Sequence, residues 1–168
     1  MPPKFDPNAV SYVSLRCYGG EVGPAAVLAP KLGPLGIAPK KAGDAIVKST
    51  QEWKGVKVAL RLRIQNRNVT CEVMPTTTAQ IIKALNEPVR DRKKVKNIKH
   101  SGNLSLDTII DIARTMRNAD HGIPSRTFAG TVLEVLGTAN AVGCTVDGKK
   151  PTEVQQQIKN QEIDIPTA

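Results

Sequence analysis

The hydrophobic pattern of this chain changes its period once, near residue 75, and that change limits the folds open to it. Before Met74, apolar and polar residues alternate in three runs, as in half-buried β-strands. From Thr76 onward, apolar residues recur every three or four positions, as in amphipathic helices. Pro75 stiffens the join. The sequence therefore predicts an α+β protein of two small domains and a tail: residues 1–75 with an antiparallel sheet and a helix, residues 76–149 all helical, and residues 150–168 as one more helix or a disordered end.

The first domain is predicted to be a small sheet covered by a helix. Residues 12–18 alternate, and two further alternating runs meet at residues 66–68, where asparagine tolerates the positive φ of a turn. Pro39 suits the first position of a helix that Gly55 can end. The apolar stripe of this helix would cover the apolar face of the sheet.

Prolines and glycines crowd the segment before that helix. Proline fixes φ and glycine permits conformations that other residues avoid, so we expect neither a strand nor a regular helix there. Two interpretations remain open: an ordered connector held by its leucines, or a docking surface that loses little entropy on binding. The residues concerned are Pro24, Pro30, Gly33, Pro34, Gly36 and Pro39.

The second domain is predicted to contain three helices. The threonines at 76–78 can cap a short helix that Pro88 closes. Ser105 caps the next helix, and Ser125 can cap a final long one that Gly143 ends. Between the first two, residues 90–99 hold six cations against one carboxylate. This basic loop, which we extend to residues 90–103, is a solvated loop, a nuclear-import signal or a segment that orders against phosphates.

The final helix has two glycines on the side away from its apolar stripe. Gly130, Gly137 and Ala141 share that side, and each interior glycine costs about 1 kcal/mol of helix stability relative to alanine. Close packing of another helix would explain them, and so would the close approach of a nucleic-acid backbone. Thr138 and Asn140 flank the smooth stripe with short polar groups, which suits the shallow minor groove of RNA better than the major groove of DNA.

Composition excludes several classes of protein. The net charge of +9 favours a polyanionic partner. Aromatic residues make up only 3%, which argues against a platform of stacked rings for unpaired bases. Three distant cysteines without a CxxC pair argue against disulfides and zinc and fit a reducing compartment. No apolar run approaches the ~20 residues of a membrane span, and the N-terminus lacks the core of a signal peptide.

Two other functions are compatible with parts of the sequence. The turn at residues 118–124, between two helices, permits a helix-turn-helix DNA-binding regulator. The last helix, however, offers no long polar side chain for base edges after Arg126. An enzyme is disfavoured because phosphate-binding, nucleophile-elbow and metal-binding motifs are absent from the sequence. We expect no catalytic residue, no metal and no cofactor.

The order and spacing of many short segments resemble one family. The chain is similar, over nearly all of its length, to the eukaryotic form of the universal stalk-base protein of the large ribosomal subunit, the bacterial "L-eleven" family, called "L-twelve" in eukaryotes. The segments that carry the resemblance are Pro2 to Asn8, Gly19 to Gly23, Leu28 to Gly36, Pro39 to Lys41, Ile64 to Arg67, Ile81 to Leu85, Asp91 to Lys94, Asn97 to Asn103, Gly137 to Ala139 and Val142 to Cys144.

The resemblance implies a function and a set of contact residues. It implies that the helical domain binds the folded GTPase-associated region of large-subunit rRNA, that the N-terminal domain faces translational GTPases, and that the neighbouring stalk-base protein carrying the acidic stalk is a partner. It also implies a cytosolic ribosome, with passage through the nucleolus during assembly. Bacterial members have a further proline where this chain has Lys31, so we do not extend the binding of thiazole-peptide antibiotics to it. By motif match, the rRNA contacts would be Lys94, Lys96, Lys99, His100, Ser101, Gly137, Thr138, Asn140, Ala141 and Gly143. The residues that face the GTPases would be Pro30, Gly33 and Pro34. Pro2 and Lys4 would belong to an N-terminal methylation site.

Overall fold

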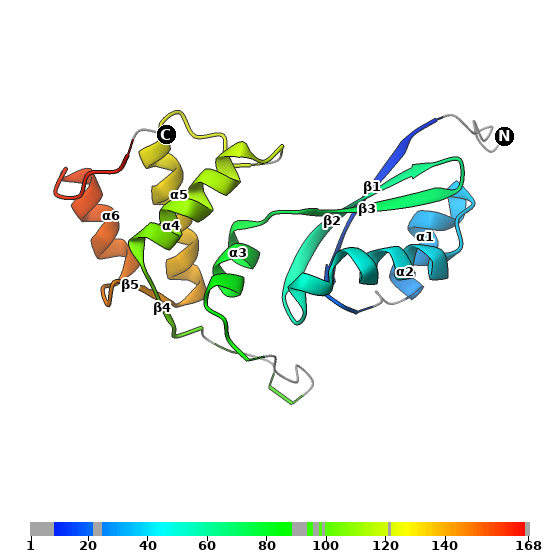
Figure 1. Cartoon of the computed structure of the whole chain (residues 1–168), viewed down its shortest axis with the longest axis horizontal. Helices are drawn as coiled ribbons and strands as arrows, with labels where there is room; N and C mark the ends of the chain where they lie inside the picture. The colour runs from blue at the N-terminus through cyan, green and yellow to red at the C-terminus, as the bar shows by residue number, and fades with distance from the viewer. Residues whose placement is uncertain are drawn as a thin grey trace. The chain divides into compact units, whose positions relative to one another are not determined.

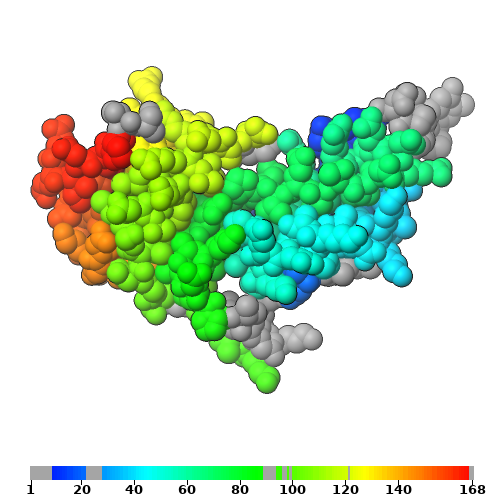
Figure 2. Space-filling model, in the orientation of Figure 1, coloured from blue at the N-terminus to red at the C-terminus, as the bar shows by residue number. Residues whose placement is uncertain are grey.

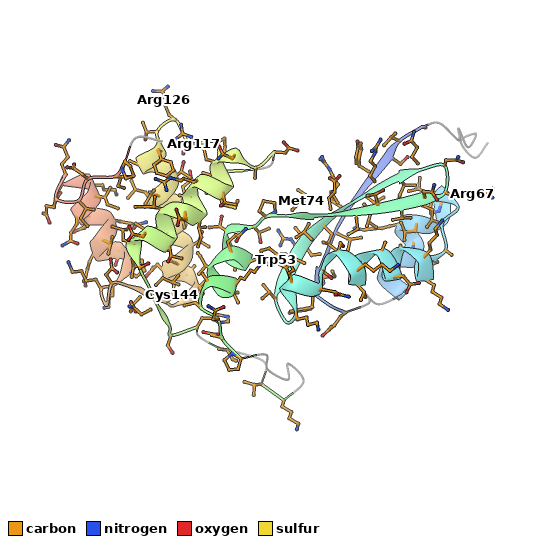
Figure 3. All side chains as sticks on the ribbon, viewed as in Figure 1. Trp53, Arg67, Met74, Arg117, Arg126 and Cys144 are labelled. Carbon is orange, nitrogen blue, oxygen red and sulfur yellow. The ribbon has the colours of Figure 1, made fainter. Side chains whose placement is uncertain are left out.

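The alternating runs of the first half form a three-stranded antiparallel sheet in a computed structural model, which describes residues 9–21, 25–88, 94–95, 98, 100–120 and 122–166. The chain divides into unit 1, Met1–Met74, and unit 2, Pro75–Ala168. Figure 1 labels the elements of both units, and Figure 3 marks Met74, where unit 1 ends. None of the described helices is long and apolar enough to cross a bilayer.

The sheet of unit 1 has the order β1-β2-β3, with strands Ser11–Tyr18, Lys57–Gln65 and Asn68–Met74. Leu60 and Leu62, on the central strand, are fully buried, while the residues between them point to the opposite face. Asn66 and Arg67 form a two-residue turn with φ of 47° and 57°, the positive values that a tight hairpin needs. The predicted sheet and hairpin are confirmed, although Asn68 already belongs to β3 rather than to the turn.

The helices of unit 1 cover one face of this sheet, as Figure 1 shows. Helix α2, Pro39–Ser49, begins at the predicted proline. It ends at Ser49, before the predicted end at Gly55. The buried Thr50 follows it, donates a hydrogen bond from Oγ1 to Ile46 O (2.7 Å) and accepts one from Gly20 N (3.0 Å). A short 3-10 turn, Gln51–Trp53, follows. The end of α2 is thereby tied to the end of β1.

The proline-rich segment contains a regular helix, contrary to the prediction. Helix α1, Ala25–Leu32, includes Pro30, and a 3-10 turn, Gly33–Leu35, follows it. Proline near the end of a short helix removes only one backbone hydrogen bond. Burial of Leu28 and Leu32, at 2% and 0% exposure, offsets that loss because both side chains reach the core.

Unit 2 is built from helices around α5. Its described elements are α3 Thr77–Ala84, α4 Leu106–Asn118, α5 Phe128–Val142 and α6 Pro151–Lys159, with a short parallel ladder of β4 Asn103–Leu104 and β5 Thr145–Val146. The ladder was not predicted. Of the two states expected for residues 150–168, the structure has the helix, α6, and this helix packs on α5 and buries Val154 and Ile158 in the core of unit 2 rather than forming a separate tail. Figure 2 shows α6, in orange, directly against the yellow-green residues of the unit.

Hydroxyl side chains cap three helices of unit 2. Thr76 caps α3 and Ser105 caps α4, both as predicted. Helix α5 is capped by Thr127, whose Oγ1 accepts from Gly130 N at 3.2 Å, and not by Ser125. The Ser125 hydroxyl instead donates to Thr127 O (3.1 Å) and contacts the hydroxyl of the buried Thr131. The cap therefore lies two residues later than the sequence suggested.

The three cysteines are free thiols, and burial raises the pKa of each. For Cys17, burial first and then the neighbouring Cys71 raise the pKa from 9.0 to about 11. A raised pKa keeps a thiol protonated and unreactive at neutral pH. Cys17 is buried and Cys71 is half-buried, opposite Val58 and Leu62 of the central strand, so both pack within unit 1.

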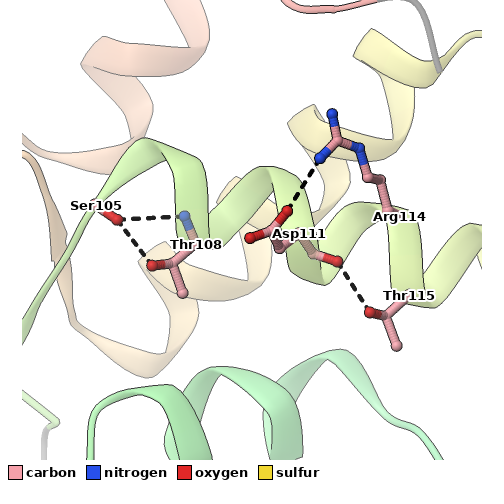
Figure 4. A network of polar contacts seen from close by, with 5 residues as sticks. All are labelled: Ser105, Thr108, Asp111, Arg114 and Thr115. Carbon is pink, nitrogen blue, oxygen red and sulfur yellow. Dashed lines mark hydrogen bonds and ion pairs between the residues drawn. The ribbon is translucent and has the colours of Figure 1, made fainter.

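The Ser105 cap is expected to contribute measurably to the stability of unit 2. Its Oγ accepts from Thr108 N at 3.3 Å and contacts Thr108 Oγ1 at 2.8 Å (Figure 4). Ser105→Ala should lower the free energy of unfolding by about 1 kcal/mol, because the first turn of α4 loses an acceptor. Urea denaturation followed by circular dichroism measures this. The control Ser101→Ala removes an exposed hydroxyl with no hydrogen bond to the described residues, and equal losses for both variants would contradict the capping role.

Candidate nucleic-acid interface

Helix α5 leaves one narrow stripe exposed. Its apolar side, with Val132, Val135 and Ala139, is fully buried by the surrounding elements of unit 2. The exposed stripe consists of short side chains, together with one carboxylate: Glu134, Gly137, Asn140, Ala141 and Gly143. Thr138 is half-buried at its edge. We call this set the α5 stripe.

Gly137 is not required by the packing of the protein. A Cβ built at this position would have Gln155 Nε2 as its nearest atom, at the ordinary contact distance of 3.6 Å. Elsewhere in unit 2 the fold does require glycine at position 122, since a Cβ there would lie 1.7 Å from the backbone oxygen of Met116. At Gly102 a Cβ would lie 2.6 Å from Leu85 Cδ2, so that side chain would have to move. An exposed glycine inside a helix costs about 1 kcal/mol relative to alanine. Close packing within unit 2 therefore does not explain Gly137.

The other glycines of α5 have internal explanations. A Cβ at Gly130 would lie 3.3 Å from Thr127 Oγ1, so the cap itself restricts this position. Gly143 has φ of 100° and donates from its N–H to Ala139 O at 3.0 Å, the left-handed geometry that ends many helices. Gly130 and Gly137 share one side of the predicted helix, but only Gly137 lacks an internal explanation in the structure.

The end of the basic loop lies beside the end of α5. His100 N donates to Val142 O at 3.4 Å, and Thr145 N donates to Gly102 O at 2.9 Å. These bonds place His100 and Ser101, two of the predicted contact residues, next to Gly143. Residues that are about 40 positions apart in the sequence thus form one continuous surface.

The polar groups of this surface differ in how many of their hydrogen-bonding positions are already used within the protein. The amide of Asn140 and the hydroxyl of Ser101 are exposed and make no hydrogen bond within the described part of the chain. Thr138 Oγ1 donates to Glu134 O at 3.2 Å and keeps only acceptor capacity. The His100 ring is half-buried and its Nδ1 contacts a carboxylate oxygen of Glu87.

Two residues were missed by sequence reasoning, one on the α5 stripe and one beside it. Glu134 lies one turn before Gly137 and places a negative charge on the stripe. Gln155 reaches over from α6 and donates from Nε2 to Leu133 O at 2.7 Å. A helical wheel of α5 could have shown Glu134. Gln155 gave no signal, because the packing of α6 on α5 is not visible in the sequence.

The remaining predicted residues lie elsewhere. Lys94 is exposed, whereas Lys96, Lys99, Pro2 and Lys4 lie outside the described residues. Pro30, Gly33 and Pro34 are exposed on α1 and the turn after it, in unit 1. Lys31 Nζ donates to Ser14 O at 3.1 Å and fastens α1 to the outer edge of β1. Among the described residues, no group of three or more histidine, cysteine or acidic side chains could hold a metal ion.

Comparisons with known proteins agree with the division into two units. The family model described as Ribosomal protein L11, N-terminal domain, matches residues 13–69, and the model described as Ribosomal protein L11, RNA binding domain, matches residues 73–146. Helix α6 lies beyond both matches.

Curated relatives match the chain over its whole length. It is 56% identical over 166 residues to large ribosomal subunit protein uL11A of Schizosaccharomyces pombe, 57% identical to uL11 of Neurospora crassa and 55% identical to uL11 of Caenorhabditis elegans. Each match covers 99% of both chains. The resemblance seen in the sequence is therefore confirmed, and the chain belongs to the ribosomal protein L11 family, in its eukaryotic form.

Proposed function

We propose that this chain is a non-catalytic constituent of the large ribosomal subunit whose unit 2 binds the folded GTPase-associated region of rRNA at the stalk base. The observation that carries the proposal is Gly137, an exposed glycine that the fold does not need, on a stripe bordered by the basic loop. The match of residues 73–146 to an RNA-binding domain supports it, as do relatives named large ribosomal subunit proteins.

The α5 stripe suits the minor groove of folded RNA. That groove is wide and shallow and presents 2′-hydroxyls, so a helix with short side chains approaches it closely. Asn140 and Ser101 offer unpartnered groups to those hydroxyls, and Ala141 and Gly143 leave room for the backbone. The lysines of the basic loop, at positions 94, 96 and 99, supply the salt-dependent attraction to phosphates.

Unit 1 is proposed to contact the translational GTPases that bind the ribosome. Its exposed Pro30, Gly33 and Pro34 lie on a segment anchored by the buried Leu28 and Leu32. Such a segment keeps one shape, so translational GTPases can contact it with little loss of conformational entropy. Within the same proposal, the neighbouring stalk-base protein is a stable partner, the mature location is the cytosolic ribosome, and assembly passes through the nucleolus.

A competition experiment separates this function from a helix-turn-helix DNA-binding regulator. Helix α5 carries no arginine, lysine or glutamine, which are the side chains that read base edges in the DNA major groove. A labelled transcript of the GTPase-associated region should bind the full chain, and unlabelled duplex DNA of equal charge should displace it poorly. Equal displacement by DNA would contradict the proposal. Sedimentation with large subunits, reversed at high salt, tests the same function in cell extracts.

Gly137→Ala is expected to separate stability from RNA binding. The new methyl group fits, since its nearest neighbour lies 3.6 Å away, and helix propensity should raise the free energy of unfolding by about 1 kcal/mol. The same group holds the RNA backbone away from α5, so affinity for the rRNA transcript should fall about tenfold, the equivalent of 1.4 kcal/mol. The measurements are urea denaturation and filter binding.

Gly33→Ala is the matched control for that variant. It makes the same chemical change in unit 1, where no atom lies within 4 Å of the new methyl group. Its affinity for the transcript should stay within twofold of the original. A Gly137→Ala variant that bound the transcript normally would remove the main support for the α5 stripe as the interface.

Lys94→Gln is expected to weaken binding and to reduce its dependence on salt. Each phosphate contact that is lost lowers the slope of log K against log salt by about 1, because fewer counterions are released. Lys159→Gln, at the end of α6, removes the same charge away from the basic loop and should leave the slope unchanged. Equal slopes for both variants would show that Lys94 acts only through net charge.

A further inference from the structure

The sheet of unit 1 has a second face that the helices of this unit do not cover. Leu60, Leu62 and their neighbours point toward α1 and α2, so the alternate residues point the other way. We call this surface the open face; the residues that matter for the argument are Tyr12, Arg16, Arg61, Arg63, Thr70 and Glu72. Neither the L11 family resemblance nor the proposed function assigns it a role.

Positive charge dominates the open face. It carries Arg16, Lys57, Arg61 and Arg63 against a single carboxylate, Glu72. Glu72 is opposite Arg61 in the strand register, while Arg63 has Tyr12 and Thr70 as its cross-strand neighbours. None of these four cations forms an ion pair within the described part of the chain. Arginines without an ion pair on one surface attract anions, although Arg63 Nη2 already donates to Gln65 Oε1 at 3.4 Å.

An exposed aromatic ring lies among these arginines. Tyr12 is 57% exposed, the largest value among the exposed large hydrophobic residues of the described chain. The guanidinium carbon of Arg61 lies 5.0 Å from the centroid of its ring, a cation–π contact that holds the ring in place. More than half of the surface of Tyr12 is open to solvent, which leaves area on which a flat ligand can stack.

A polar cavity lies next to the ring. It has a volume of about 370 Å³ and is lined by Arg63, Gln65, Asn66, Asn68 and Thr70, at the hairpin whose tip is marked by Arg67 in Figure 3. Its walls offer a guanidinium, three amides and a hydroxyl. Because Arg63 is directly opposite Tyr12 in the register, the cavity and the ring are adjacent.

We infer that the open face binds an unpaired RNA segment, with one base stacked on Tyr12 and the adjoining phosphate and sugar held at Arg63 and the cavity. Stacking on an aromatic ring beside arginine, with phosphate contacts, is how proteins bind single strands. A protein partner fits less well, since the cavity has no apolar wall for the aliphatic or aromatic anchor that dominates such interfaces. The low aromatic content argues against a row of stacked bases, but the site proposed here needs only one aromatic ring, that of Tyr12.

The test uses the full chain, labelled with ¹⁵N, and a short oligouridylate that forms no internal pairs. Amide shifts should appear on β1, β2 and β3 around Tyr12 and Arg63, which separates this site from the rRNA site of unit 2. Tyr12→Leu and Arg63→Gln should each weaken binding about fivefold or more. Lys48→Gln removes an exposed charge from α2, on the covered side of the sheet, and should change affinity by less than about twofold.

Three outcomes would overturn the inference. In the first, the oligouridylate shifts only residues of unit 2. In the second, Tyr12→Leu binds as well as the original chain, which would leave simple charge attraction as the explanation. In the third, a polyglutamate peptide of equal charge shifts the open face with equal or higher affinity, which would assign the surface to an acidic protein. None of these outcomes depends on whether unit 2 binds rRNA.

Discussion

The packing of α5 on several sides is the constraint on which unit 2 depends. Helices α3, α4 and α6 all contact it, so almost every position of α5 must be apolar or small. Only one stripe remains for contact with anything outside the protein. An interface built on such a helix reads shape through close approach, and its charges must come from another segment, here the basic loop.

The comparison of glycines separates the demands of the fold from those of function. Gly122 is fixed by a backbone contact that any Cβ would violate, and Gly143 by its positive φ. Gly137 has none of these reasons, although it has a helical conformation that alanine would stabilise. A residue that lowers stability without any internal benefit is best explained by a partner. The same logic makes the exposed Tyr12 in unit 1 a residue to explain, since burial would have been the favourable state for its ring.

The sequence predicted those elements in which periodicity and local signals agree. Strand alternation located β1 to β3, Pro39 located the start of α2, and Ser105 located that of α4. Where two hydroxyls lie close together, spacing could not choose between them, and Thr127 rather than Ser125 caps α5. Helix α1 was not predicted because the prolines of its segment disfavour a helix. The burial of Leu28 and Leu32, which stabilises it, depends on tertiary packing that the local sequence does not show.

The candidate site was predictable to the extent that it is local. A helical wheel gives the α5 stripe, and the lysine run gives the basic loop. Their contact depends on the bond of His100 N to Val142 O at the end of α5, on the bond of Thr145 N to Gly102 O, and on the short β4–β5 ladder. All three join residues that are about 40 positions apart in the sequence. Gln155 and Glu87 enter the site from distant segments for the same reason. Pairings this short leave no periodic trace in a sequence.

The charges along α5 also limit how an RNA can lie on it. Glu134 repels phosphates from the N-terminal part of the stripe, and the C-terminal end of any helix carries partial negative charge from its free carbonyls. Two features weaken that second effect here: His100 N–H occupies the carbonyl of Val142, and Gly143 and Cys144 both donate to Ala139 O. The basic loop ends at the same place. Under the proposed RNA-binding function, phosphates would lie beside the loop, and sugars and groove edges would lie on the neutral middle of the stripe, around Gly137.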